Sequence, residues 1–207
     1  GDGGRIETSG FHLDVAGIDI TLSSKLPFKN GFWLLDPYDY TLSGSNVTAI
    51  EAALSEGTDV TITTSASSNP SFTYTDPGTG NSANATIDAD SVSDSTGGTI
   101  TLNDEIMVSG SGSGDLTLRA DKKIILNHNI TNMTGSGDLN LESVEGIELR
   151  SYLSGGTTQY SEISWDTSTS GIVGLTSSAS GGLTAVSASN QIDVSNGSLI
   201  IDQAGDT

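Results

Sequence analysis

The residues best suited to catalysis in this 207-residue chain are two histidines and several aspartates. His12 and His128 each lack a second histidine at the spacing of metal ligands, so an ordinary surface or turn histidine is the simpler interpretation. Stacked carboxylates can also form the site of a polysaccharide hydrolase or lyase. The acids that we consider for such a site are Asp36, Asp39, Asp115 and Asp138.

A lyase also requires a basic residue that accepts a proton and neutralises the carboxylates of its substrate. The basic residues nearest to Asp115 are Arg119, Lys122 and Lys123. The repeat described below, however, places two of them opposite glutamates. We therefore predict no catalytic residue, no metal site and no cofactor, and we favour a function that is not enzymatic.

Three aromatic residues form a candidate ligand-binding site. Tyr152, Tyr160 and Trp165 flank the polar residues 154–161, which lie between two predicted strands. Aromatic rings on such a loop can stack on sugar rings, whereas packing within the loop is the competing explanation.

Asparagine sequons provide a further kind of site. The sequence Asn-x-Ser/Thr accepts N-linked glycans where a transferase is present. In a chain so rich in Ser, Thr and Asn, several sequons are also expected by chance. The possible glycosylation sites are Asn46, Asn84, Asn129, Asn132 and Asn196.

The charge of the chain restricts its partners. The formal net charge is −19, with 7 Lys and Arg against 26 Asp and Glu. This balance argues against nucleic acid or an anionic membrane as a partner. No stretch reaches the length of a membrane span, so membrane insertion is not expected. The absence of cysteine excludes a disulfide scaffold.

Residues 31–64 are predicted to form a strand, a helix and a second strand within an otherwise all-β sequence. The helix is predicted from the apolar stripe of Ile50, Ala53 and Leu54, which should be buried because so short a helix needs tertiary packing. Its boundaries are predicted from Asn46 or Thr48 as the N-cap, from the capping-box spacing of Thr48 and Glu51, and from Gly57 after the last turn.

These segments resemble the large exoproteins of bacterial two-partner (type Vb) secretion, the filamentous-haemagglutinin-like adhesins. That family has a Gly-Gly-x-Ile-Glu-Thr-Ser-Gly repeat end, then Trp-Leu-(Leu/Ile)-Asp-Pro, then Ile-Glu-x-x-Leu-x-x-Gly-Thr. The matching residues here are Gly3, Gly4, Ile6, Glu7, Thr8, Ser9, Gly10, Trp33, Leu34, Leu35, Asp36, Pro37, Ile50, Glu51, Leu54, Gly57 and Thr58. The resemblance covers residues 1–64. It implies a right-handed β-helix, secretion through a dedicated outer-membrane transporter and adhesion at the cell surface.

Two regions beside these motifs are predicted from their local patterns. Residues 11–22 alternate apolar and polar side chains, which predicts two short strands with a corner at Ala16 and Gly17. Residues 65–96 are rich in turn signals and are predicted to leave the main body as a loop or hairpin.

A repeat becomes measurable from residue 97 onward. The segments GGTITL, SGDLTL, SGDLNL and SGGLTA each place glycine before apolar residues two apart. The 44 residues from Leu139 to Leu183 correspond to about two turns, with Ile163 and Trp165 between them. An offset of about 23 residues between the second and third segments indicates one turn of a stacked structure. The aligned pairs are Leu116 with Leu139, Leu118 with Leu141, Ile124 with Ile147, Leu126 with Leu149, Arg119 with Glu142, Lys122 with Glu145 and, unfavourably, Asp115 with Asp138.

We therefore predict an all-β chain, a right-handed parallel β-helix (solenoid) with one short helix and with loop or hairpin insertions. Residues 1–207 are expected to be one fragment of a longer exoprotein, since the chain starts inside a repeat-like sequence without a signal peptide. The expected parts are the insertion at 31–64, the excursion at 65–96, and regular turns of about 22–23 residues over 97–207.

The predicted function is that of a segment of a secreted bacterial surface adhesin that attaches to host cells, to other surfaces or to carbohydrate. Its expected partners are the outer-membrane transporter during export and a host receptor or glycan. A passive stalk that presents a distal adhesive or toxin domain is the first alternative. A polysaccharide-degrading β-helix enzyme is the second.

Overall fold

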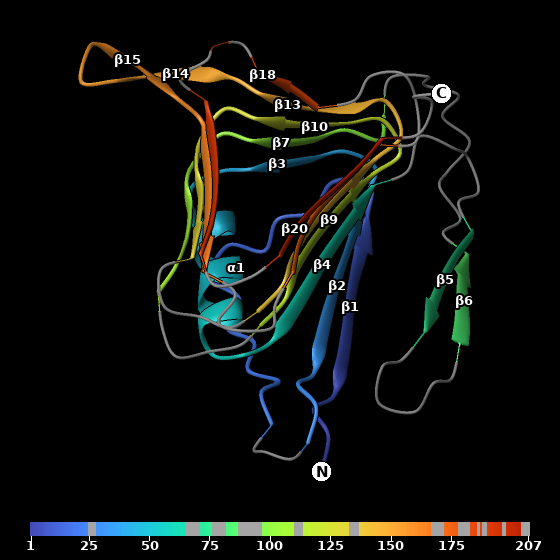
Figure 1. The fold of residues 1–207 in the computed structure, drawn as a ribbon. Coiled ribbons are helices and arrows are strands. Elements are labelled where there is room, and N and C mark those ends of the chain that lie inside the picture. Colours follow the sequence, from blue (N-terminus) through green and yellow to red (C-terminus); the bar gives the residue numbers. More distant parts are fainter. Residues whose placement is uncertain are drawn as a thin grey trace.

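The computed structural model describes residues 1–24, 28–64, 71–75, 82–86, 97–109, 114–132, 137–166, 172–177, 183–185, 187, 190–195 and 198–203. Within these ranges the chain is mostly β-structure with one helix, and its main sheets are parallel. The all-β class predicted from the sequence is therefore confirmed. Figure 1 shows three sheets arranged as three sides around a common interior.

The first sheet has seven strands, and all of its neighbouring strands are parallel. In spatial order its strands are β1 (Arg5–Gly10), β2 (Phe32–Pro37), β4 (Asp59–Thr64), β9 (Leu116–Ala120), β12 (Leu139–Ser143), β17 (Ile172–Ser177) and β20 (Ser198–Gln203).

The second and third sheets are also parallel. The second contains β3 (Tyr40–Leu42), β7 (Ile100–Leu102), β10 (Lys123–Leu126), β13 (Gly146–Leu149) and β18 (Leu183–Ala185). The third contains β8 (Ile106–Val108), β11 (Ile130–Asn132), β16 (Glu162–Asp166) and β19 (Gln191–Ser195). From β4 onward the chain visits the three sheets in turn, and we call each such passage a circuit.

Two antiparallel hairpins stand apart from the three sheets. One pairs β5 (Ser71–Thr75) with β6 (Ser82–Thr86), inside the region predicted to be a loop or hairpin. The other pairs β14 (Ser151–Ser154) with β15 (Thr157–Tyr160), between β13 and β16, and projects away from the main body in Figure 1.

Aliphatic ladders fill the interior between the sheets. Leu116 pairs with Leu139, and Ile124 pairs with Ile147, so the register predicted from the sequence is confirmed. All four side chains are essentially inaccessible to solvent. These ladders therefore connect strands of neighbouring circuits within one buried apolar cluster.

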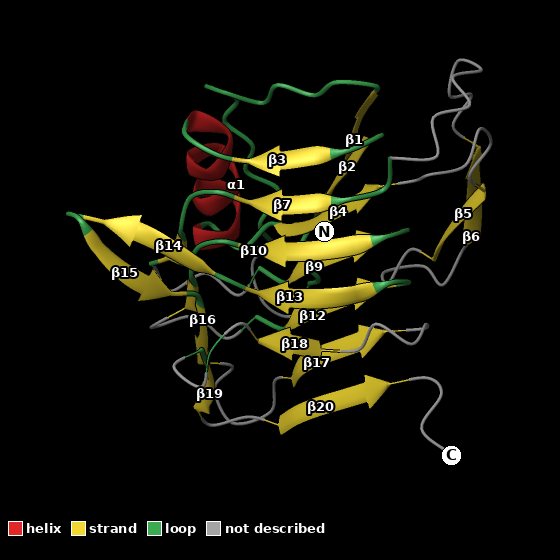
Figure 2. Cartoon of the chain, turned by 90° about the horizontal axis from the view of Figure 1, so that it is seen from above, coloured by secondary structure: helices red, strands yellow, loops and turns green. Residues whose placement is uncertain are grey.

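The helix α1 (Ser45–Ser55) contacts β8, at the edge of the third sheet, and β4. In Figure 2 the helix lies at the level of β3 and β7, and its contact with β8 places it on the third side of the circuit that contains β2 and β3. Ile50, Ala53 and Leu54 are fully buried, as predicted. Gly57, with φ of 86°, ends the helix in a Schellman arrangement: its N–H bonds Leu54 O at 3.0 Å, and the next N–H bonds Ala53 O at 2.9 Å.

The predicted N-terminal cap of α1 is wrong. Gly44 occupies the N-cap position, and no side chain caps the helix. Asn46 instead accepts a hydrogen bond from Val15 N–H at 2.7 Å, and Glu51 accepts one from Met107 N–H at 2.6 Å. These side chains connect the helix to distant segments, so they are not available to satisfy its own first turn.

The strands predicted for residues 11–22 are not formed. The corner is present as a turn, with Gly17 at φ of 75° and Ile18 N–H bonded to Val15 O at 3.1 Å. Val15 and Leu22 donate their N–H groups to side chains, those of Asn46 and Thr58, and not to a neighbouring strand. Leu13, Val15, Ile20 and Leu22 nevertheless pack on the core, which explains why the pattern resembles that of strands. Ile18, in contrast, is exposed.

The prediction that Leu183 lies about two turns beyond Leu139 at an equivalent position is wrong. SGDLTL and SGDLNL belong to the first sheet, but Ile100 of GGTITL pairs with Ile124, and Leu183 of SGGLTA pairs with Ile147, both in the second sheet. The same pattern of glycine and alternating residues suits strands of either sheet. The length of a circuit also varies. Arg119 and Glu142, which are in contact on adjacent circuits, are 23 residues apart in the sequence, whereas Asp138 and Ile172 are 34 residues apart. The difference arises because β14 and β15 are inserted between Asp138 and Ile172.

Candidate functional site

The hairpin β14–β15 carries two of the three aromatic residues predicted to bind a ligand. Tyr152 and Tyr160 lie on its two strands and are partly exposed. Their rings are on opposite faces, because Tyr152 is opposite Gln159 whereas Tyr160 is opposite Ser151. Tyr152 stacks on His128, with ring centroids 3.9 Å apart. The two tyrosines therefore cannot form one joint platform.

Trp165, the third predicted ligand residue, is in the core. Its side chain is only 1% exposed, and its indole N–H donates a hydrogen bond to Gly137 O at 2.7 Å. No face of this ring is open to a sugar, so its prediction as a ligand residue is wrong. The spacing of apolar and polar residues in β16 is that of an inward-facing position, and it would have indicated this outcome.

A second aromatic group was missed in the sequence. Phe11 stacks on Tyr38 with ring centroids 4.8 Å apart, and His12 meets Phe11 edge-on at 4.6 Å. Phe11 is 44% exposed, so part of this stack is open to solvent. We call these three residues the aromatic corner. Its members come from segments on either side of β2, and no local sequence pattern signals that they would meet.

The acids of the first sheet form a ladder of hydrogen bonds from circuit to circuit. Asp59 Oδ1 accepts from Asp115 N–H at 3.1 Å, Asp115 Oδ1 accepts from Asp138 N–H at 2.7 Å, and Asp138 Oδ1 accepts from Ile172 N–H at 2.7 Å. Burial, followed by the charge of Asp59, raises the pKa of Asp115 to about 7. The contact of Asp115 with Asp138 looks repulsive in the sequence, but main-chain donors compensate for it.

Asp36 is a buried acid on β2. Its side chain is 2% exposed, and one carboxyl oxygen has no hydrogen-bond partner among the described residues. Burial is the main reason that its pKa rises from 3.8 to about 7, and the charge of Glu7 adds to the effect. Because this carboxyl group is buried, it is not placed to act on a substrate from solvent as a catalytic acid.

The other features of an enzyme site are not assembled among the described residues. Asp39 accepts a hydrogen bond from Thr99 N–H at 2.8 Å, and no group of three or more His, Asp or Glu in the described ranges could hold a metal ion.

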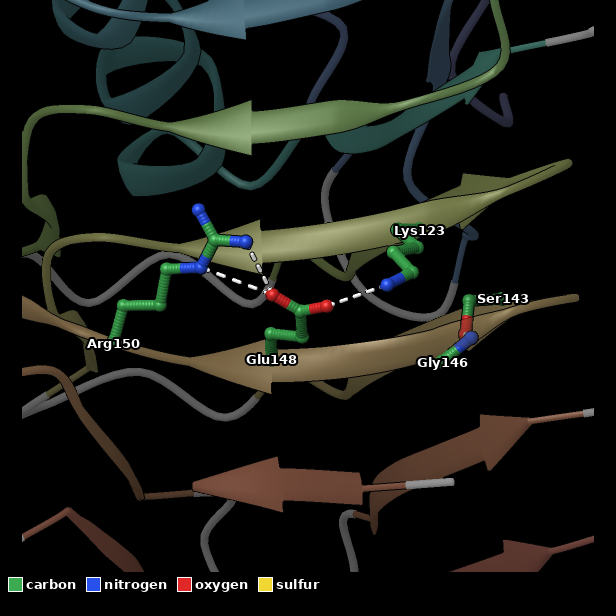
Figure 3. A network of polar contacts seen from close by, with 5 residues as sticks. All are labelled: Lys123, Ser143, Gly146, Glu148 and Arg150. Carbon is green, nitrogen blue, oxygen red and sulfur yellow. Dashed lines mark hydrogen bonds and ion pairs between the residues drawn. The ribbon is translucent and has the colours of Figure 1, made fainter. Parts of the chain in front are cut away.

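Arg119 pairs with Glu142 at 2.7 Å, as predicted. Figure 3 shows Glu148 between Lys123, at 2.6 Å, and Arg150. The hydrogen bond from Lys123 is the main reason that the pKa of Glu148 is lowered.

The predicted glycosylation sites differ in their environment. Asn132 is buried, so a transferase could not reach it in the folded chain. The side-chain oxygens of Asn46 and Asn129 accept hydrogen bonds from Val15 and Glu162 N–H groups. Asn84 belongs to β6, whose side chains are outside the described part of the chain, as is the whole of Asn196.

Comparisons with known proteins found no matching family model, no matching curated protein and no matching solved structure. Among the described residues, no helix has the length and apolar character needed to cross a membrane.

Proposed function

We propose that this chain is a right-handed parallel β-helix and serves as a segment of a secreted bacterial surface adhesin. The three stacked parallel sheets support the architecture, because strands of one circuit pair in register with those of the next. The handedness follows from the general rule that crossovers between parallel strands of one sheet are right-handed in about 98% of cases.

Export through a two-partner-secretion transporter is part of the same proposal. It rests on the motifs of residues 1–64, whose Trp33, Leu35, Ile50 and Leu54 are all buried. A chain with a core built circuit by circuit suits a protein that folds after crossing a membrane, because each circuit needs only its neighbours. In this proposal the chain acts at the bacterial cell surface, outside the cell that makes it.

The observation that carries the adhesive role is the aromatic corner. Exposed, stacked aromatic rings outside a core are typical of surfaces that bind sugars or proteins. Phe11 provides such a ring, Tyr38 supports it from a half-buried position against Gly97, and His12 lies edge-on to Phe11. A host receptor or a glycan is therefore the proposed ligand. The passive stalk is the alternative, and it is favoured by the paired charges on the outer faces of the middle circuits.

The proposal is tested with the purified chain on a glycan array and in a cell-attachment assay. We expect binding that falls at least tenfold in Phe11→Ala. Phe28→Ala is the matched control, because Phe28 is similarly exposed at 47% but lies outside the stack. Absence of binding to every glycan and cell type would favour the stalk. Release of unsaturated or reducing sugars from polysaccharides would favour the enzyme.

A further inference from the structure

The hairpin β14–β15 is uncharged, although it belongs to a strongly acidic chain. The sequence SYLSGGTTQY contains no Asp, Glu, Lys or Arg, whereas the chain as a whole carries −19. The hairpin is also exposed along most of its length, and Leu153 is 76% accessible to solvent. A neutral, projecting element with an open leucine is an unusual feature on such a surface.

The hairpin is inserted without disturbing the stack. Asn129 and Glu162, which bond across neighbouring circuits, are 33 residues apart, compared with 23 for Arg119 and Glu142. Ile130 still pairs with Ile163 on the far side of the insertion. The fold therefore does not need the hairpin to maintain its register, so another explanation for the element is required.

The outer edge of β15 is open for pairing. Gly155 and Gly156 both have positive φ, at 57° and 80°, as a two-residue type I′ turn requires. In such a hairpin Ser154 and Thr157 form a hydrogen-bonded pair, and the pairs alternate from there. The bond of 2.7 Å from Ser161 N–H to Arg150 O agrees with this alternation.

It follows that Thr158 and Tyr160 direct their main-chain N–H and C=O groups to the outer edge of β15. Among the described strands, only β14 pairs with β15. Natural proteins usually block such an edge with lysine, proline or a bulge. The sequence TTQY has neither lysine nor proline, and its threonines and tyrosine favour strand pairing.

We propose that β15 is a self-association edge, on which β15 of a second copy of this chain pairs antiparallel. A two-fold axis at Gln159 places Thr158 of each copy opposite Tyr160 of the other, and each of these two pairs exchanges main-chain hydrogen bonds. Leu153 and Tyr160 lie on the same face of the hairpin, so the four-stranded sheet presents both apolar side chains of both copies together.

Electrostatics explains why the contact belongs at the hairpin. Two chains of charge −19 repel one another, but each hairpin joins its body two residues beyond Gln159, so the paired strands hold the two bodies about 14 Å apart along the strand direction. This length exceeds the Debye length of about 8 Å at physiological salt, whereas at about 0.01 M salt the Debye length is about 30 Å. The pairing should therefore strengthen with added salt, the reverse of a contact held by opposite charges.

Sedimentation equilibrium of the whole chain tests the proposal. Between about 10 μM and about 1 mM at physiological salt, we expect the mass to rise from 21.1 kDa toward twice that value, and to rise less at about 0.01 M salt. Thr158→Pro removes an outward N–H but no bond within the hairpin, so it should remain monomeric. Thr158→Val, which keeps the N–H, should associate like the parent chain. A constant mass of 21.1 kDa, or equal association of Thr158→Pro, would overturn the proposal.

A cross-linking experiment gives an independent test if Thr158→Pro disturbs the hairpin. The chain has no cysteine, so Gln159→Cys introduces a single thiol at the proposed axis. Residues opposite each other in a pair without hydrogen bonds have Cα atoms about 4.5 Å apart, which permits a disulfide. We expect a disulfide-linked dimer from Gln159→Cys and none from Thr157→Cys. Equal cross-linking of both variants would show that another surface, and not this edge, brings the copies together.

Discussion

Replacing Asp36 with asparagine should change the pH dependence of stability. The buried carboxyl group has a pKa of about 7 in the folded chain, compared with a value of 3.8 in an exposed setting. Below pH 3.8 it is protonated in both the folded and the unfolded chain. As the pH rises to 7 the unfolded chain releases this proton more readily, so the folded chain loses stability across this window.

The size of the effect follows from the change in pKa. At about 1.4 kcal/mol for each tenfold change in the ionisation constant, the ionised Asp36 costs the folded chain about 4 kcal/mol above pH 7. An asparagine side chain cannot ionise, so the Asp36→Asn variant should lose this part of the pH dependence. Because one carboxyl oxygen has no hydrogen-bond partner among the described residues, the amide that replaces it brings a constant penalty of about 1–3 kcal/mol. The diagnostic quantity is therefore the slope with pH and not the stability at one pH.

Urea unfolding followed by circular dichroism at several pH values from about 4 to about 8 measures this slope. The parent chain should lose about 4 kcal/mol more than Asp36→Asn over that range, and the variant should retain the loss that Asp115 causes, since the pKa of Asp115 is also raised to about 7. Asp19→Asn removes the same charge from an exposed position and serves as the control. Parallel curves for the parent chain and Asp36→Asn would refute the reasoning.

Three further experiments test the core and the register. Leu54→Ala should lower the free energy of unfolding by about 2–5 kcal/mol in urea melts, and a neutral result would mean that α1 is not packed as described. Ile124→Asn should cost a similar amount, roughly 2–5 kcal/mol, whereas Glu142→Gln should cost about 0.2–1 kcal/mol in the same assay; equal losses would contradict the view that the aliphatic ladders hold the stack. Gly137→Ala places a methyl group 2.1 Å from a carbonyl oxygen of the preceding circuit and should lower the thermal midpoint strongly, while Gly4→Ala, whose nearest contact is at 3.7 Å, should not.

The register of the stack could be predicted from the sequence because two kinds of residue agreed. Leu116 and Leu139 required the same offset as Arg119 and Glu142, and the structure contains both pairs. The helix was predictable because Ile50 and Leu54 had helical spacing in a sequence of alternating residues. Its N-cap was not predictable, because Asn46 bonds to a residue distant in sequence.

The aromatic corner and the buried acid could not be predicted in this way. Phe11 meets Tyr38 only because the irregular segment after β1 returns to the start of the second sheet. Asp36 precedes proline, yet β2 extends through Pro37 and buries the carboxyl group. Both outcomes depend on contacts between segments, which local periodicity does not record.

The aspartate ladder gives the stack a direction. At each step the acceptor belongs to the earlier circuit and the N–H donor to the later one, from Asp59 to Asp115, Asp138 and Ile172. A chain that assembles from its N-terminal end therefore finds an acceptor already in place for every circuit that arrives. Assembly from the other end would instead find a main-chain donor in place, so the ladder by itself does not select the order of assembly. Each side chain thus reaches forward along the chain, so replacing Asp115 would remove the acceptor of the circuit that follows it and leave the hydrogen bond to the preceding circuit in place.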